Sequence, residues 1–108
     1  MSLDPDKIYA HIMECAKEWV SADEESRKLH ELQPIILAEI FNRMDESASV
    51  AQRKSWAMAS AEYKLHITNM VAAKTKANST LARYKAAQNL AELRRSEESS
   101  RRAEMNIR

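Results

Sequence analysis

Five basic side chains share one line when the second half of the sequence is drawn as a helix at about 100° per residue. They are Lys54, Lys76, Arg83, Arg94 and Arg101. From Lys76 to Arg101 the line extends roughly 37 Å at 1.5 Å per residue. Cations spaced in this way can contact successive phosphates of a nucleic acid, and such binding weakens with salt because counterions are released. The alternative is an ordinary solvated helix face, but such a face normally mixes both signs, and this line contains no acid.

Three further cations, Lys64, Lys74 and Lys85, lie in the same basic segment. The two halves of the chain differ in charge, because residues 1–48 carry 5 Lys/Arg against 11 Asp/Glu and residues 49–108 carry 12 against 5. A segment this basic attracts a polyanion or an acidic partner, and the acidic first half is one such partner. Asn78, Ser79 and Thr80 add hydrogen-bonding groups to the basic segment.

A line of acidic residues, opposite in charge to the basic line, is predicted on the first helix. Its members fall within about 60° of one another on the helical wheel, and they are Glu14, Glu18, Glu25 and Glu39. This line flanks the apolar side of the helix, where charges select a helical partner in coiled coils. We therefore expect it to guide pairing within the chain or between subunits, and to leave the basic line, which faces away from the core, exposed.

Catalytic and metal-binding chemistry has little support. His11 and Cys15 are four residues apart and can face one ion, but a closed site needs four ligands and none lies nearby in the sequence. His30 and His66 have no nucleophile beside them. Because the chain contains no glycine, it has no glycine-rich phosphate loop. The sequence predicts a protein that is not an enzyme and binds no metal or cofactor.

The absence of glycine also predicts an all-α fold, since sheets and tight turns depend on glycine far more than helices do. We expect a single domain, a long antiparallel helical hairpin with coiled-coil character. Its parts are an acidic helix over residues 5–44, kinked near Pro34, a basic helix over residues 49–91, and a charged tail over residues 92–108 that is helical or frayed. Asp4 and Pro5 form the expected helix start.

Two sites allow an alternative interpretation with additional breaks. The segment Ser21–Glu24 has the pattern of a capping box that restarts the first helix. Ser60 to Glu62 is a second candidate break, which would divide the chain into three helices in place of two.

Apolar residues recur at steps of three and four in both helices, as in a coiled coil. The first set is Ile8, Ile12, Cys15, Trp19, Ala22, Ser26, Leu29, Gln33, Ile36 and Ile40; the second is Trp56, Ser60, Tyr63, Ile67, Met70, Lys74, Ala77, Leu81, Tyr84, Gln88 and Ala91. Packing is the expected role of both tryptophans and of Tyr84, and Trp56 is expected to contact the end of the first helix.

Because two thin helices have a large surface for their volume, we also expect a homo-oligomer.

The N-terminus shows no secretory signal and no segment is apolar enough to span a membrane. The single cysteine fits a reducing compartment. We therefore expect a soluble cytoplasmic protein, which for a phage-encoded chain means the host cytoplasm.

The last 50 residues or so resemble small helical proteins that phages and prophages encode among recombination and replication genes. The resemblance rests on Glu62-Tyr63-Lys64, Ala72-Ala73-Lys74, Ala77-Asn78, Arg83-Tyr84-Lys85, Arg94-Arg95-Ser96-Glu97-Glu98 and Arg101-Arg102-Ala103-Glu104-Met105. The basic helix is also similar to that of UvsY-type phage recombination mediators, with Met/Leu, Lys and Arg-x-Tyr positions.

This second resemblance implies an oligomeric protein that binds single-stranded DNA and helps to load a recombinase onto DNA coated by single-strand-binding protein. The matching basic positions are Lys64, Lys74, Lys76, Arg83 and Lys85. The acidic first helix has no counterpart in that family, so the subunit arrangement does not carry over. The alternative is a protein-binding coiled-coil adaptor, or a structural or anti-host phage protein, whose basic half docks on an acidic protein.

Overall fold

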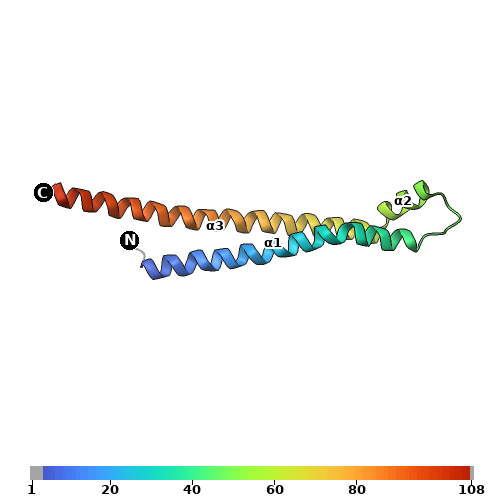
Figure 1. The fold of residues 1–108 in the computed structure, drawn as a ribbon, viewed down its shortest axis with the longest axis horizontal. Coiled ribbons are helices and arrows are strands. Elements are labelled where there is room, and N and C mark those ends of the chain that lie inside the picture. The colour runs from blue at the N-terminus through green and yellow to red at the C-terminus, as the bar shows by residue number, and fades with distance from the viewer. Residues whose placement is uncertain (1–3, 108) are drawn as a thin grey trace. The chain divides into compact units, whose positions relative to one another are not determined.

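The computed structural model describes residues 4–107, and within that range every regular element is a helix. Helix α1 spans Pro5–Asn42, α2 spans Val50–Ala59 and α3 spans Ala61–Ile107 (Figure 1). The predicted all-α fold, a helical hairpin with three helices, is confirmed. Residues 92–107, predicted as a helical or frayed tail, continue α3 without a break.

The chain divides into two compact units, and α1 and α3 contribute to both. The terminal unit consists of residues 1–20 and 78–108, and the central unit consists of residues 21–77, which include α2. In the central unit, Gln33 of α1 contacts Tyr63 of α3 and Leu29 contacts His66, so the two helices run in opposite directions. The terminal unit shows the same antiparallel order, because Ile8 lines a groove with Arg94 and Trp19, further along α1, stacks on Tyr84, which lies earlier in α3.

Helix α1 begins as its sequence predicts. The backbone N–H of Asp6 donates to the carboxylate of Asp4 at 3.0 Å, and Pro5 is the first helical residue. The helix then continues through residues 21–24, as the prediction of a single first helix requires, and the alternative of a restart there does not occur. Ala22 within that segment is buried in the helix contact, and packing holds the backbone helical where the local capping pattern offers an alternative. The helix also continues through Pro34.

The connection after α1 is held by side chains bonded to the backbone. The Ser47 N–H donates to the Asp45 carboxylate at 3.0 Å, and this bond holds the pKa of Asp45 below its ordinary value. Ser49 then starts α2 with a reciprocal capping box, in which its hydroxyl accepts from the Gln52 N–H and the Gln52 side chain accepts from the Ser49 N–H. The polar run of residues 45–49, whose composition in the sequence favours a turn between the two predicted helices, therefore ends one helix and starts the next.

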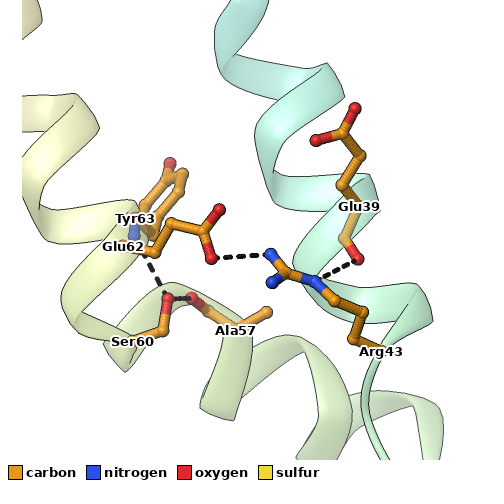
Figure 2. A network of polar contacts seen from close by, with 6 residues as sticks. All are labelled: Glu39, Arg43, Ala57, Ser60, Glu62 and Tyr63. Atoms are coloured by element: carbon orange, nitrogen blue, oxygen red, sulfur yellow. Dashed lines mark hydrogen bonds and ion pairs between the residues drawn. The ribbon is translucent and has the colours of Figure 1, made fainter.

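Ser60 separates α2 from α3 (Figure 2). Its backbone is extended, its hydroxyl donates to the Ala57 carbonyl at 2.7 Å, and the same oxygen accepts from the Tyr63 N–H at 3.2 Å. One serine thus closes the end of α2 and caps the start of α3. This is the break that the sequence offered as the three-helix alternative.

The core of the central unit lies where the end of α1 meets α2 and the start of α3. Ile40, Ala57 and Tyr63 are buried there, and Phe41 packs at the edge. Trp56, for which core packing is expected, is 49% exposed, while Ala57 beside it is fully buried. The two caps at Ser49 and Ser60 make α2 a separate helix, so its rotation does not follow the periodicity of α3.

The buried side of α3 follows a strict seven-residue repeat. Its members are buried or half-buried, and they are Tyr63, His66, Met70, Ala73 and Ala77 in the central unit, then Thr80, Tyr84, Ala87, Ala91, Arg94 and Glu98 in the terminal unit. The expected positions Lys74 and Gln88 are exposed, because Ala73 and Ala87, one residue earlier, face α1 in their place. The remaining expected positions Ile67 and Leu81 are half-buried beside this repeat.

The expected positions of α1 are all buried or half-buried. These are Ile8, Ile12, Cys15 and Trp19 in the terminal unit, and Ala22, Ser26, Leu29, Gln33, Ile36 and Ile40 in the central unit. Both helices therefore use one side for their mutual contact within the chain.

Candidate nucleic-acid interface

The predicted line of five cations is not a single exposed face. Lys54 lies on α2, a different helix, because the chain breaks at Ser60. A seven-residue repeat lags a straight 100° wheel by about 20° per heptad. Over the length of α3 this lag brings Arg94 to the side that faces α1, where its side chain is only 23% exposed. The line of five cations was predicted on a straight helical wheel, whereas the side of α3 that contacts α1 follows the seven-residue repeat.

Arg83 is engaged by the acidic helix. Its Nη1 lies 2.8 Å from Oε2 of Glu18 in an ion pair whose side chains are 59% and 38% exposed. Within the terminal unit, a member of the acidic line therefore pairs with a member of the basic line. The expectation that the acidic line guides helix pairing holds for this residue. Arg83 is exposed, as expected for the basic line, but its guanidinium is engaged by Glu18.

Arg94 lines a groove between α1 and α3 in the terminal unit. The groove has a volume of about 300 Å³, and its floor includes Ile8, Ile12 and Ala91. Arg94 Nε lies 3.7 Å from Oε1 of Glu98 and is buried without a hydrogen bond. An arginine held in this way contributes its aliphatic stem to packing.

The cations that remain exposed are distributed over both units. The central unit presents Lys64 and Lys74 on α3, together with Lys54 on α2. The terminal unit presents Lys85, Arg101 and Arg102. Within residues 4–107, none of these six side chains forms an ion pair. Lys76 is exposed as well, one heptad before Arg83.

The basic stretch of α3 is free of acids over 29 residues. From Tyr63 to Ala91 the helix carries Lys64, Lys74, Lys76, Arg83 and Lys85 and no Asp or Glu. Its positive field is reduced by Glu62 and Glu92, which border the stretch on α3 itself, and by acids from other elements. Among the latter, Glu18 forms the ion pair with this stretch that is described above.

Tyr84 packs within the chain and does not offer a ring for stacking on a base. It is half-buried and stacks on Trp19 of α1, with ring centroids 5.8 Å apart and planes inclined by 14°. Offset stacking of this kind stabilises a helix contact by about 0.5–1.5 kcal/mol beyond the buried area.

The side of α3 that points away from α1 has an unusual composition, and we call it the outer face. In the terminal unit it consists of Ser79, Ala82, Ala86, Asn89, Leu93, Ser96, Ser100 and Ala103, all exposed and all uncharged. In the central unit its members, Leu65, Thr68, Ala72 and Thr75, are also exposed and uncharged. The spacing of three and four residues is that of a second coiled-coil contact surface.

The corresponding side of α1 looks entirely different. In the terminal unit it presents Lys7, Glu14 and Lys17, and in the central unit Glu24, Lys28 and Glu31. These charges alternate in sign and are interspersed with the exposed uncharged residues Ala10, Ser21, Ile35 and Ala38. This is the pattern of a solvated helix face. The outer face of α3 lacks that pattern. The distribution of charges along the sequence does not reveal this face, whereas the second seven-residue repeat of uncharged residues in α3 does.

The remaining chemistry-bearing groups form no site. Cys15 Sγ lies 3.8 Å from Nε2 of His11, but across residues 4–107 no cluster of three or more His, Cys, Asp or Glu is placed to hold a metal ion. A groove of about 630 Å³ in the central unit is lined by Asp23, Arg27, His30, Glu31 and Lys74, a mixture of both charges. In the part of the chain that the structure describes, no helix has the length and apolar character needed to cross a membrane.

Comparison of the chain with protein-family models, curated proteins and solved structures found no match.

Proposed function

We propose that this protein is a non-enzymatic accessory factor that binds nucleic acid, preferentially single-stranded DNA, in the cytoplasm during phage recombination or replication. The observation that carries the proposal is the acid-free stretch of α3 from Tyr63 to Ala91, with its five Lys/Arg. A recombinase or a single-strand-binding protein is the expected protein partner in such a reaction.

The binding surface in this proposal differs from the straight line of five cations. Lys64 and Lys74 act from the central unit, and Lys85, Arg101 and Arg102 act from the terminal unit, because these side chains are exposed and outside ion pairs. Arg94 contributes packing. Arg83 contributes to binding only if its exposed ion pair with Glu18 opens, which costs little because such pairs stabilise by about 1 kcal/mol or less.

The test is binding of labelled single- and double-stranded oligonucleotides over a salt series. We expect affinity to fall steeply with salt, and the slope for single strands to decrease by about 0.7 for each phosphate-contacting cation that is removed. The variant K64E/K74E tests the central unit and R101E/R102E tests the terminal unit.

A matched control separates local contacts from net charge. The variant K17E/K28E changes the total charge as much as K64E/K74E does, on the mixed-charge face of α1. Loss of binding in the α3 variants with retention in the control supports the proposal. Absence of binding at low salt, or equal loss in the control, contradicts it.

The second candidate function is that of a protein-binding coiled-coil adaptor or structural phage protein. The uncharged outer face of α3 favours it, since a helix that remains in water seldom lacks charges on its exposed side. Recovery of a specific acidic protein in a pulldown after nuclease treatment would support this function over the first.

A further inference from the structure

We infer that the outer face of α3 is a self-association surface, on which the segment 79–96 of one chain packs antiparallel against the same segment of a second copy. This surface is distinct from the helix contact predicted from the sequence, because that contact is already occupied by α1 within the chain. The inference does not depend on nucleic-acid binding.

The composition of the segment fits a close helix contact. Ala82 and Ala86 allow two backbones to approach, and the apolar side chains Leu90 and Leu93 are 43% and 58% exposed in one chain. Antiparallel pairing that places Ala82 opposite Leu93 of the second copy sets a small side chain against a large one at both ends of the contact. Ser79 and Ser96 then face each other one layer further out.

Asn89 lies at the centre of this contact. It faces Ala86 of the second copy, and the two Asn89 side chains occupy adjacent layers, about three residues or roughly 4.5 Å apart along the axis. Their amides can then hydrogen-bond to each other across the two-fold axis. A buried asparagine lowers the stability of a coiled coil but fixes its register. A shift of one heptad that places Asn89 against Leu93 would leave the amide facing an apolar side chain, which is costly without a hydrogen-bond partner.

The charges that flank the segment select the same register. Lys85 and Glu92 lie on the same side of the outer face, one heptad apart. In the register above, Lys85 of one copy lies about two residues, or roughly 3 Å along the axis, from the level of Glu92 of the second copy. Glu92 also forms an exposed ion pair with Arg95 of its own chain at 3.0 Å, and its carboxylate has further acceptor positions for Lys85 of the second copy. The two-fold symmetry of the pair repeats this contact, so two opposite-charge pairs flank the interface. On the other side, the stem of Arg83 covers Leu90 of the second copy.

Alternative pairings bring like charges together. Moving the register by one heptad in one direction places Lys85 against Lys85, and in the other direction it places Glu92 against Glu92. A parallel pair in register places Glu92 against Glu97. Like charges across a coiled coil disfavour the pairing, so the sequence supports one arrangement of the two copies.

The exposed area of the chain is sufficient for such a contact. The chain exposes 8375 Å², whereas a compact protein of 12.4 kDa exposes about 6,100 Å². The difference exceeds the roughly 800 Å² that each partner contributes to a standard interface. A second copy can therefore cover part of this excess. The α3 of the second copy carries the uncharged seven-residue repeat and the flanking charges that match the outer face.

The first experiment measures the mass of the full-length protein by light scattering in the absence of nucleic acid. We expect about twice the 12.4 kDa of one chain. The variant A86E/N89E brings glutamates of the two copies face to face in the central layers, and it should be monomeric with unchanged helical circular dichroism. The control A10E/A38E, which changes two exposed alanines of α1, should remain dimeric. A monomeric native protein, or a dimeric A86E/N89E variant, overturns the inference and leaves the outer face to another partner.

The second experiment tests the register. In a C15A background, chains with S79C and chains with S96C are mixed and oxidised. Mixed S79C–S96C disulfides are expected in excess over either homodimeric disulfide, because only antiparallel pairing brings these positions together. A predominance of S79C–S79C disulfides establishes a parallel pair and contradicts the proposed arrangement. Charge reversal gives an independent check, since E92K should weaken the dimer and K85E/E92K should restore it.

Discussion

Arg83 on α3 and Glu18 on α1 form an ion pair of 2.8 Å, which ties a residue of the basic helix to a residue of the acidic helix. The two charged lines that divide the sequence into an acidic and a basic half therefore meet, at this point, inside the chain. Part of the charge asymmetry serves helix pairing, and only the cations outside such pairs remain for an external polyanion.

Exchange of these two charges should show that they interact. We expect R83E and E18R each to lower the free energy of unfolding by about 1 kcal/mol or less, because the pair is exposed to solvent. The double variant E18R/R83E should recover most of the loss, since the pair is restored in the opposite sense. Thermal unfolding followed by circular dichroism measures all three. Additive losses in the double variant would show that the two side chains are not coupled.

The stacked pair of Trp19 and Tyr84 should stabilise the terminal unit more than any exposed ion pair. Replacement W19A removes a half-buried aromatic ring and its stacking partner contact, so we expect a loss of about 2 kcal/mol or more. W56A is the matched control and should cost much less, because Trp56 is 49% exposed. Tryptophan fluorescence distinguishes the two environments. Trp56, which remains in W19F, should emit at a longer wavelength than Trp19, which remains in W56F. Equal losses would contradict the assignment of Trp19 as the packed tryptophan.

Tyr63 should stabilise the central unit through its hydroxyl as well as its ring. The Gln33 side-chain amide donates to this hydroxyl at 2.9 Å, and Tyr63 is 8% exposed. We expect Y63F to lower the free energy of unfolding by about 0.5–1.5 kcal/mol, since Gln33 loses its acceptor. Chemical denaturation gives the value, and Y9F, at a tyrosine that is 66% exposed, serves as the control. A loss no larger than that of Y9F would mean that the bond contributes nothing.

Ser49 should be required for the correct start of α2. The S49A variant removes the hydroxyl that accepts from the Gln52 N–H, and we expect it to cost about 1 kcal/mol. S55A, at an exposed serine within α2, keeps both caps intact and is the matched control. Hydrogen exchange of the α2 amides should increase in S49A and remain unchanged in S55A. Equal protection in the two variants would show that the capping box does not hold the helix.

Arg94 should tolerate an apolar replacement. Because its Nε is buried without a hydrogen bond on the side of α3 that faces α1, R94M should leave the free energy of unfolding equal or higher. The same variant should bind oligonucleotides nearly as well as the native protein, in contrast to R101E/R102E. A large loss of affinity for oligonucleotides in R94M would show that Arg94 belongs to the nucleic-acid-binding surface.

Local chemistry was sufficient to predict the helices and their first contact. The lack of glycine and the start at Asp4 and Pro5 predict α1 and the all-α fold, and the polar run before Ser49 predicts the turn. The side of α1 that faces α3 follows from the repeat of Ile8, Trp19 and Ile40, since burial of apolar side chains depends mainly on their spacing along a helix.

Only the tertiary structure decided which charges remain exposed. A helical wheel treats α3 as straight and alone, but its contact with α1 follows a heptad, and the resulting drift turns Arg94 inward and brings Arg83 within reach of Glu18. Tertiary contacts likewise decided that Ala57 is buried in place of Trp56, because the rotation of α2 is set by its caps and by the core it meets. The repeat on one helix predicts which residues can be buried, and the partner helix determines which residues are.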